Sequence, residues 1–82
     1  MGNLDRNVKY NLRTYSGYKG EETPRALVAG VKEWDIDKIV SRKRKIDLES
    51  GQQWDEFECR VGGETLRIRI FRSGKWSLSF PE

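Results

Sequence analysis

The chain has 82 residues, with 16 Lys or Arg against 13 Asp or Glu and a formal net charge of +3. A single domain of this size offers little volume for an internal catalytic cavity, so the protein is expected to act through its surface. It has no histidine and one cysteine, which removes the commonest general base, the usual zinc ligand sets and any disulfide within the chain.

No apolar run approaches the length of a membrane span, about 18 residues, and no charged-then-apolar leader opens the chain. The sequence therefore favours a cytoplasmic protein that contacts no membrane, carries no cofactor or metal, and is not an enzyme. Residues 1–6 are polar and lack an apolar pattern beyond Leu4. They are expected to be a flexible end, and residues 7–82 to form one small β domain.

The first predicted strand is VKYNLRT (8–14), in which apolar and polar residues alternate. The stretch YSGYKGEETPRAL (15–27) follows, with two glycines that permit a positive φ and a proline that fixes the entry to a second strand, RALVA. In one interpretation Tyr15 and Tyr18 cover the open end of the sheet. In the other, the two rings and Lys19 form an exposed aromatic and basic patch suited to stacking on bases or clamping a peptide.

The middle segment, VKEWDIDKIVSRKRKIDL (31–48), is compatible with two secondary structures. Alternation favours a long, bent strand over residues 32–44 that pairs with residues 57–61, and it places on one face Trp34, Ile36, Val40, Ile46 and Leu48. The alternative is a helix near residues 32–44, which would make the fold α+β. That helix would lack a capping residue and would contain several β-branched side chains.

A run of four basic residues ends this segment: Arg42, Lys43, Arg44 and Lys45. Such a cluster can dock a phosphate backbone or an acidic partner. It can also be a solvated strand end whose charges protect a sheet edge from aggregation.

The last third of the chain predicts a three-stranded meander. FECRV, TLRIRIFR and KWSLSF alternate, and they are separated by Gly62-Gly63, typical of a tight primed turn, and by Ser73-Gly74. On the polar face, the two glutamates of the first strand are expected to pair with Arg67 and Arg69, while Phe71 needs a cover or a partner. Cys59 is expected to be a small core residue rather than a reactive thiol. The predicted core is Tyr10, Leu12, Leu27, Trp34, Ile36, Phe57, Cys59, Leu66, Ile68, Trp76 and Leu78.

The segment Tyr15-Ser16-Gly17-Tyr18-Lys19, followed by WDEFECRV and RSGKWSLSF, resembles a family of very short bacterial proteins of unknown function. A related domain is similar to the C-terminal piece of some inactive polymerase-like proteins of bacterial mutagenesis cassettes. The resemblance implies a β fold and an association with DNA repair, and it implies no catalytic residue.

The sequence thus predicts an all-β fold, a small antiparallel meander of five or six strands curled into a barrel or roll. The expected function is an uncharacterised, non-catalytic accessory or binding module, a monomer or weak dimer with a protein partner. The alternative is a nucleic-acid-binding domain linked to DNA repair. The predicted binding surface comprises Tyr15, Tyr18, Lys19, Arg42, Lys43, Arg44 and Lys45.

Overall fold

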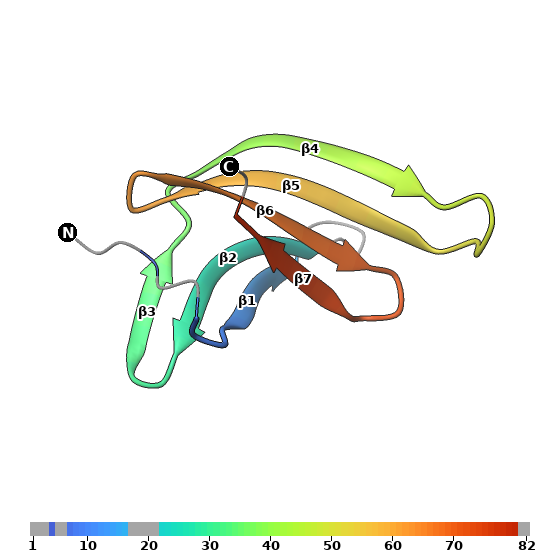
Figure 1. The fold of residues 1–82 in the computed structure, drawn as a ribbon. Helices are drawn as coiled ribbons and strands as arrows, with labels where there is room; N and C mark the ends of the chain where they lie inside the picture. Colours follow the sequence, from blue (N-terminus) through green and yellow to red (C-terminus); the bar gives the residue numbers. More distant parts are fainter. Residues whose placement is uncertain (1–3, 5–6, 17–21, 81–82) are drawn as a thin grey trace.

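In the computed structural model, which describes Leu4, residues 7–16 and residues 22–80, the chain forms two antiparallel sheets. The first contains β1 (Asn11–Ser16), β2 (Glu22–Ala29) and β3 (Lys32–Asp35). The second contains β4 (Lys38–Ile46), β5 (Gln53–Val61), β6 (Glu64–Phe71) and β7 (Trp76–Ser79). In both sheets each strand lies beside its neighbour in sequence, so each sheet is a simple meander (Figure 1).

The all-β antiparallel fold class is confirmed. The described residues form seven strands in two meanders, where the sequence predicted five or six in one, and they include no closed barrel. The helix considered for residues 32–44 is wrong, because this whole segment is described and is extended except at a two-residue break. Two residues of the predicted binding surface, Tyr18 and Lys19, lie outside the described residues.

The middle segment is two strands of different sheets rather than one bent strand. The chain crosses between the sheets at Ile36 and Asp37, whose backbone N–H groups donate to the carbonyls of Arg25 and Arg60, each at 2.8 Å. The predicted pairing with residues 57–61 is confirmed for β4, whereas β3 pairs with β2. The crossing lets Trp34 and Ile36 enter the same core from the opposite side to β4.

A β-bulge at Val40 decides which side chains of β4 face the first sheet. The register shifts between Ile39 and Ser41, so Ile39 lies opposite Cys59 and Arg42 lies opposite Phe57. Even-numbered residues beyond the bulge therefore share the core-facing side of the sheet. Ile46 is on that side yet 53% exposed, because the β4–β5 hairpin extends beyond the ends of β1 and β2 (Figure 1).

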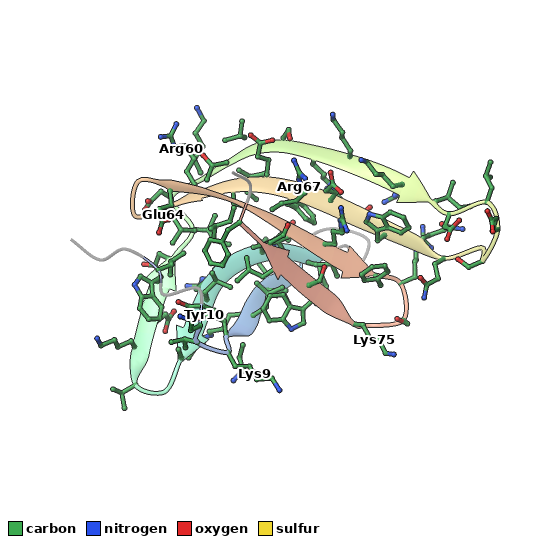
Figure 2. The ribbon with its side chains drawn as sticks, in the orientation of Figure 1. Lys9, Tyr10, Arg60, Glu64, Arg67 and Lys75 are labelled. Carbon is green, nitrogen blue, oxygen red and sulfur yellow. The ribbon has the colours of Figure 1, made fainter. Side chains whose placement is uncertain are left out.

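The core lies between the two sheets and contains every residue that the sequence predicted for it. Six predicted members are buried, namely Tyr10, Leu27, Phe57, Cys59, Leu66 and Ile68. The other five pack around them as partly buried side chains. Leu4 is buried as well, at 5% exposure, and its N–H donates to the Glu64 carboxylate at 2.8 Å. Tyr10, labelled in Figure 2, meets the Trp34 ring edge-on, with centroids 5.5 Å apart.

The β5–β6 hairpin turns as its sequence predicts. Gly62 and Gly63 have φ values of 56° and 86°, the left-handed region that a two-residue primed turn requires at both central positions. Asp37, at the crossing between the sheets, accepts a hydrogen bond from the Gly62 N–H at 3.0 Å. This contact ties the turn of one sheet to the segment that enters from the other.

Candidate nucleic-acid interface

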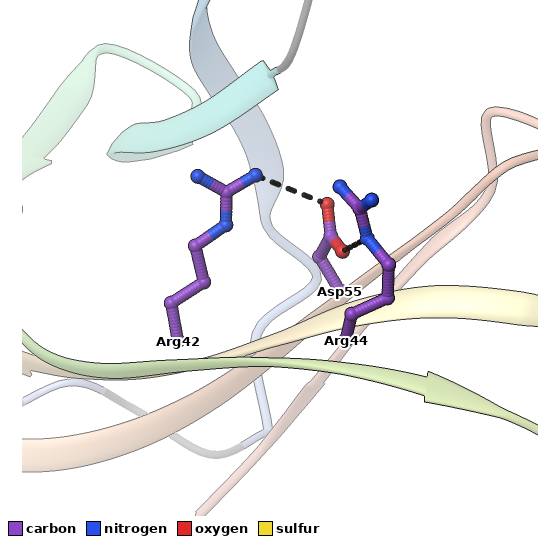
Figure 3. Close-up of polar contacts among 3 residues, drawn as sticks. All are labelled: Arg42, Arg44 and Asp55. Atoms are coloured by element: carbon purple, nitrogen blue, oxygen red, sulfur yellow. Dashed lines mark hydrogen bonds and ion pairs between the residues drawn. The ribbon is translucent and has the colours of Figure 1, made fainter.

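The predicted basic run of β4 is divided between the two faces of its sheet. By register, Arg42 and Arg44 lie on the inner face, which we define as the side toward β1 and β2, and Lys43 and Lys45 lie on the outer face. Figure 3 shows the two arginines on the inner side with Asp55 between them. One Asp55 oxygen is 3.1 Å from Arg44 Nε and the other is 3.5 Å from Arg42 Nη2.

These two arginines serve the packing of the β4–β5 hairpin. The Arg42 guanidinium also lies over the Phe57 ring, 5.4 Å from its centroid, a favourable contact of a cation with an aromatic face. Both side chains are thus engaged with neighbouring strands on the inner face. Lys43 and Lys45 are the members of the run that face away from the core.

The outer face is assembled from all four strands of the second sheet. Residues directly opposite one another in antiparallel strands share a face, so the register defines its members: Lys38, Ser41, Lys43, Lys45, Trp54, Glu56, Glu58, Arg60, Thr65, Arg67, Arg69, Phe71, Ser77 and Ser79. Six of these residues are cations and two are carboxylates. The first sheet packs on the other side, and Figure 2 shows Arg60 and Arg67 pointing away from it.

Glu56 lies at the centre of this face beneath three cations. Its two oxygens are 3.0 Å from Arg69 Nε, 3.3 Å from Lys45 Nζ and 3.6 Å from Arg67 Nε. Burial works against the charged carboxylate, but hydrogen bonds from Arg69 and Lys45 outweigh it, so the pKa of Glu56 lies below its ordinary value. The Glu56 side chain is only 11% exposed while the three cations are 38–44% exposed. A ligand therefore meets the cations before the carboxylate.

The expected cross-strand pairing of glutamates with arginines is confirmed at Glu56. Three further cations of the outer face, Lys38, Lys43 and Arg60, are exposed and form no ion pair with any described residue. Their charges are available to an anionic ligand. The outer face thus combines cations paired with Glu56 and cations that form no ion pair with a described residue.

An aromatic pair closes one end of the outer face. Trp54 and Phe71 lie opposite each other on β5 and β6, with ring centroids 5.4 Å apart and planes tilted by 41°. The Trp54 indole N–H is buried and has no hydrogen-bond partner among the described residues. Beside Phe71 is an open depression of about 320 Å³, lined by Gly51, Gln52, Gln53, Phe71, Arg72 and Ser73.

The described residues do not gather the predicted surface into one place. Tyr15 is 61% exposed and belongs to β1 of the first sheet, whereas Lys43 and Lys45 lie on the outer face of the second. The sequence pattern predicted ion pairs for Arg67 and Arg69 and did not place either of them in the binding surface. Their common face could have been read from the Gly62-Gly63 turn, which fixes the β5–β6 register and with it the parity of every side chain on the hairpin.

No group of three His, Cys, Asp or Glu side chains in the described part of the chain is placed to hold a metal ion, and no helix there is long and apolar enough to cross a membrane. Burial, with the nearby charge of Glu58, raises the pKa of the Cys59 thiol to about 11, which keeps it protonated and unreactive at neutral pH. No family model, curated protein or solved structure matches this chain.

Proposed function

We propose that this protein is a non-catalytic binding module whose ligand is nucleic acid, bound across the outer face of the β4–β7 sheet. The observation that carries the proposal is the charge of that face, where six cations from three strands accompany two carboxylates. Phosphate contacts of this kind supply most of the affinity of sequence-independent nucleic-acid binding.

The dimensions of the cationic face suit a chain of phosphates. Along β5, Arg60 and Trp54 are six residues apart, which corresponds to about 20 Å of extended strand. Lysines of β4 and arginines of β6 flank β5 on both sides over this length. A phosphate backbone laid along the strand would therefore have a cation within reach at several successive positions.

The arrangement of Glu56 adds to this complementarity. Because the carboxylate already holds Lys45, Arg67 and Arg69 in place, less side-chain entropy is lost when these cations contact a phosphate. The partial exposure of the three cations leaves their remaining N–H donors open to solvent. The implied link to DNA repair is part of this proposal and rests on the resemblance of the Tyr15–Lys19 segment.

The test is the salt dependence of binding, measured by fluorescence anisotropy with labelled 12-nucleotide single strands and duplexes between 50 and 200 mM KCl. The variant Lys38→Gln/Lys43→Gln/Arg60→Gln removes cations that make no described ion pair, so its stability should be nearly unchanged. Each lost phosphate contact should lower the slope of log affinity against log salt by about 0.7 for single strands and about 0.9 for duplex DNA.

The matched control is Lys9→Gln/Arg25→Gln/Lys32→Gln, which changes the net charge by the same amount at exposed positions on or beside the first sheet. We expect the outer-face variant to lose affinity and slope, and the control to retain most of both. Equal losses would mean that only net charge matters. Absence of binding by the wild-type protein at 50 mM KCl would overturn the proposal and favour an acidic protein segment as the ligand.

A further inference from the structure

We infer that the nucleic acid is single-stranded and that one of its bases stacks on the Trp54–Phe71 pair at the end of the outer face. This inference rests on the proposed function and specifies the ligand further. It is carried by the aromatic pair, an observation separate from the charges: two rings 5.4 Å apart on the same face as the cations.

The pair occupies a face that no described element covers. Residues of β1, β2 and β3 pack against the opposite side of the sheet, with Phe57, Leu66 and Ile68. Trp54 and Phe71 belong to neither core cluster, although large aromatic side chains gain most when they are buried in a core. A partly buried aromatic pair on a charged sheet face, with no described element packed over it, is suited to a flat, partly apolar ligand group.

The register places cations beside the rings, where the phosphates on either side of a stacked base would lie. Lys45 lies directly opposite Trp54, so that one row across the sheet reads Lys45, Trp54, Phe71. The adjacent row, two residues along β5 and about 7 Å away, contains Lys43 and Arg69 on either side of Glu56. A base on the rings would thus carry its flanking phosphates to cations on both rows.

Stacking on these rings selects for an unpaired strand. The faces of bases inside a duplex are covered by their neighbours, whereas an unpaired base can lay one face on an aromatic side chain regardless of its identity. The depression beside Phe71, about 320 Å³ with Arg72 and Gln53 in its lining, is at the small end of the range for ligand sites. Because Phe71 lines it, the depression adjoins the proposed stacking surface.

The test compares an eight-residue thymidine oligonucleotide with an oligonucleotide of the same length and charge that contains abasic sugars in place of every nucleotide. Both present the same phosphates, so only a stacked base separates them. We expect wild-type protein to bind the thymidine strand more tightly, by about 5- to 150-fold for one stacked base. A thymidine–adenine duplex of equal length should not bind more tightly than the abasic strand through stacking, because its bases are already paired and stacked.

Phe71→Leu keeps an apolar side chain over Trp54 but removes the aromatic face, and should abolish most of the preference for intact bases while leaving the salt slope unchanged. Tyr15→Leu is the matched control, because it removes an exposed ring from the other sheet. If Phe71→Leu does not fold, the Trp54 indole N–H signal of the wild-type protein gives the answer, since it should shift with thymidine strands and not with abasic ones.

Equal binding of intact and abasic strands with a preserved salt slope would overturn the stacking inference and leave the phosphate-binding proposal standing. Loss of the base preference in Tyr15→Leu, with Phe71→Leu unaffected, would also overturn it and move the stacking surface to β1. If neither strand binds, both the inference and the proposed function fail.

Discussion

Replacement of Ile68 by alanine tests the assignment of the core between the two sheets. Ile68 is fully buried in β6, where its neighbours across the strands are Phe57 on β5 and Leu78 on β7. The substitution removes three carbon groups, worth about 0.8 kcal/mol each in transfer from water, which sets a floor of about 2.4 kcal/mol. A cavity that its neighbours cannot fill raises the expected loss to about 3–4 kcal/mol.

That loss is large against the stability of the whole domain. Native domains are stable by about 0.05–0.15 kcal/mol per residue, or about 4–12 kcal/mol for a chain of this length. A loss of about 3 kcal/mol should lower the melting temperature by roughly 12–24 °C. Urea unfolding followed by tryptophan fluorescence is a suitable assay, because Trp34 and Trp76 pack against the core and should change their emission on unfolding.

Ile46→Ala is the matched control, since it removes the same atoms from a side chain that is 53% exposed on the projecting end of β4. It should cost no more than about 1 kcal/mol. If Ile46→Ala destabilised the protein as much as Ile68→Ala did, the assignment of the core would be wrong. The cost of each substitution would then not follow the burial that the packing of the two sheets gives each side chain.

Three further predictions follow from individual contacts. Cys59 should resist alkylation at pH 8 in native protein and react once urea unfolds it; because burial raises its folded pKa to about 11, stability present below pH 9 should be lost as pH rises through 11, and Cys59→Ala should lack this loss. Glu56 has a lowered pKa, so its stabilising contribution should be present above pH 4.5 and disappear as pH falls through the folded value; Glu56→Gln should remove that part of an acid-unfolding curve, and an unchanged curve would contradict the cation cluster. Gly63→Ala should lower the free energy of unfolding, measured by chemical denaturation, by about 1–2 kcal/mol, because φ is 86° at this position. The added Cβ meets no other atom, so backbone strain is the only cost. Gly63→Asn should cost less, because asparagine tolerates this conformation better.

Alternation and turn chemistry were sufficient to predict the second sheet from β5 to β7. The period of two fixed which residues of these strands face inward, and Gly62-Gly63 fixed how they pair, because few other dipeptides accept a positive φ at both turn positions. Both signals are local, since they depend on residues close together in the chain. In the first sheet the same signals identified Leu27 but not its neighbour Ala26, which is also fully buried.

Local signals could not predict how the middle segment is divided between the two sheets. Residues 32–44 alternate as one strand would, yet the chain crosses between sheets at Ile36 and shifts register at Val40. No local pattern in residues 36–37 marks the crossing. It is favourable because it places β3 and β4 on opposite sides of one core. Only the packing of the two sheets could select it.

The candidate site depended on tertiary structure for the same reason. In sequence, Arg42 to Lys45 form the densest positive charge, but the strand directs alternate members to opposite faces, and Asp55 engages the inner two. The arginines that share the outer face with Lys43 come from positions 17 to 26 residues further along the chain. Sequence determined the chemistry available to each strand, and the pairing of β4, β5 and β6 decided which charges and rings meet, because a face exists only once its strands are side by side.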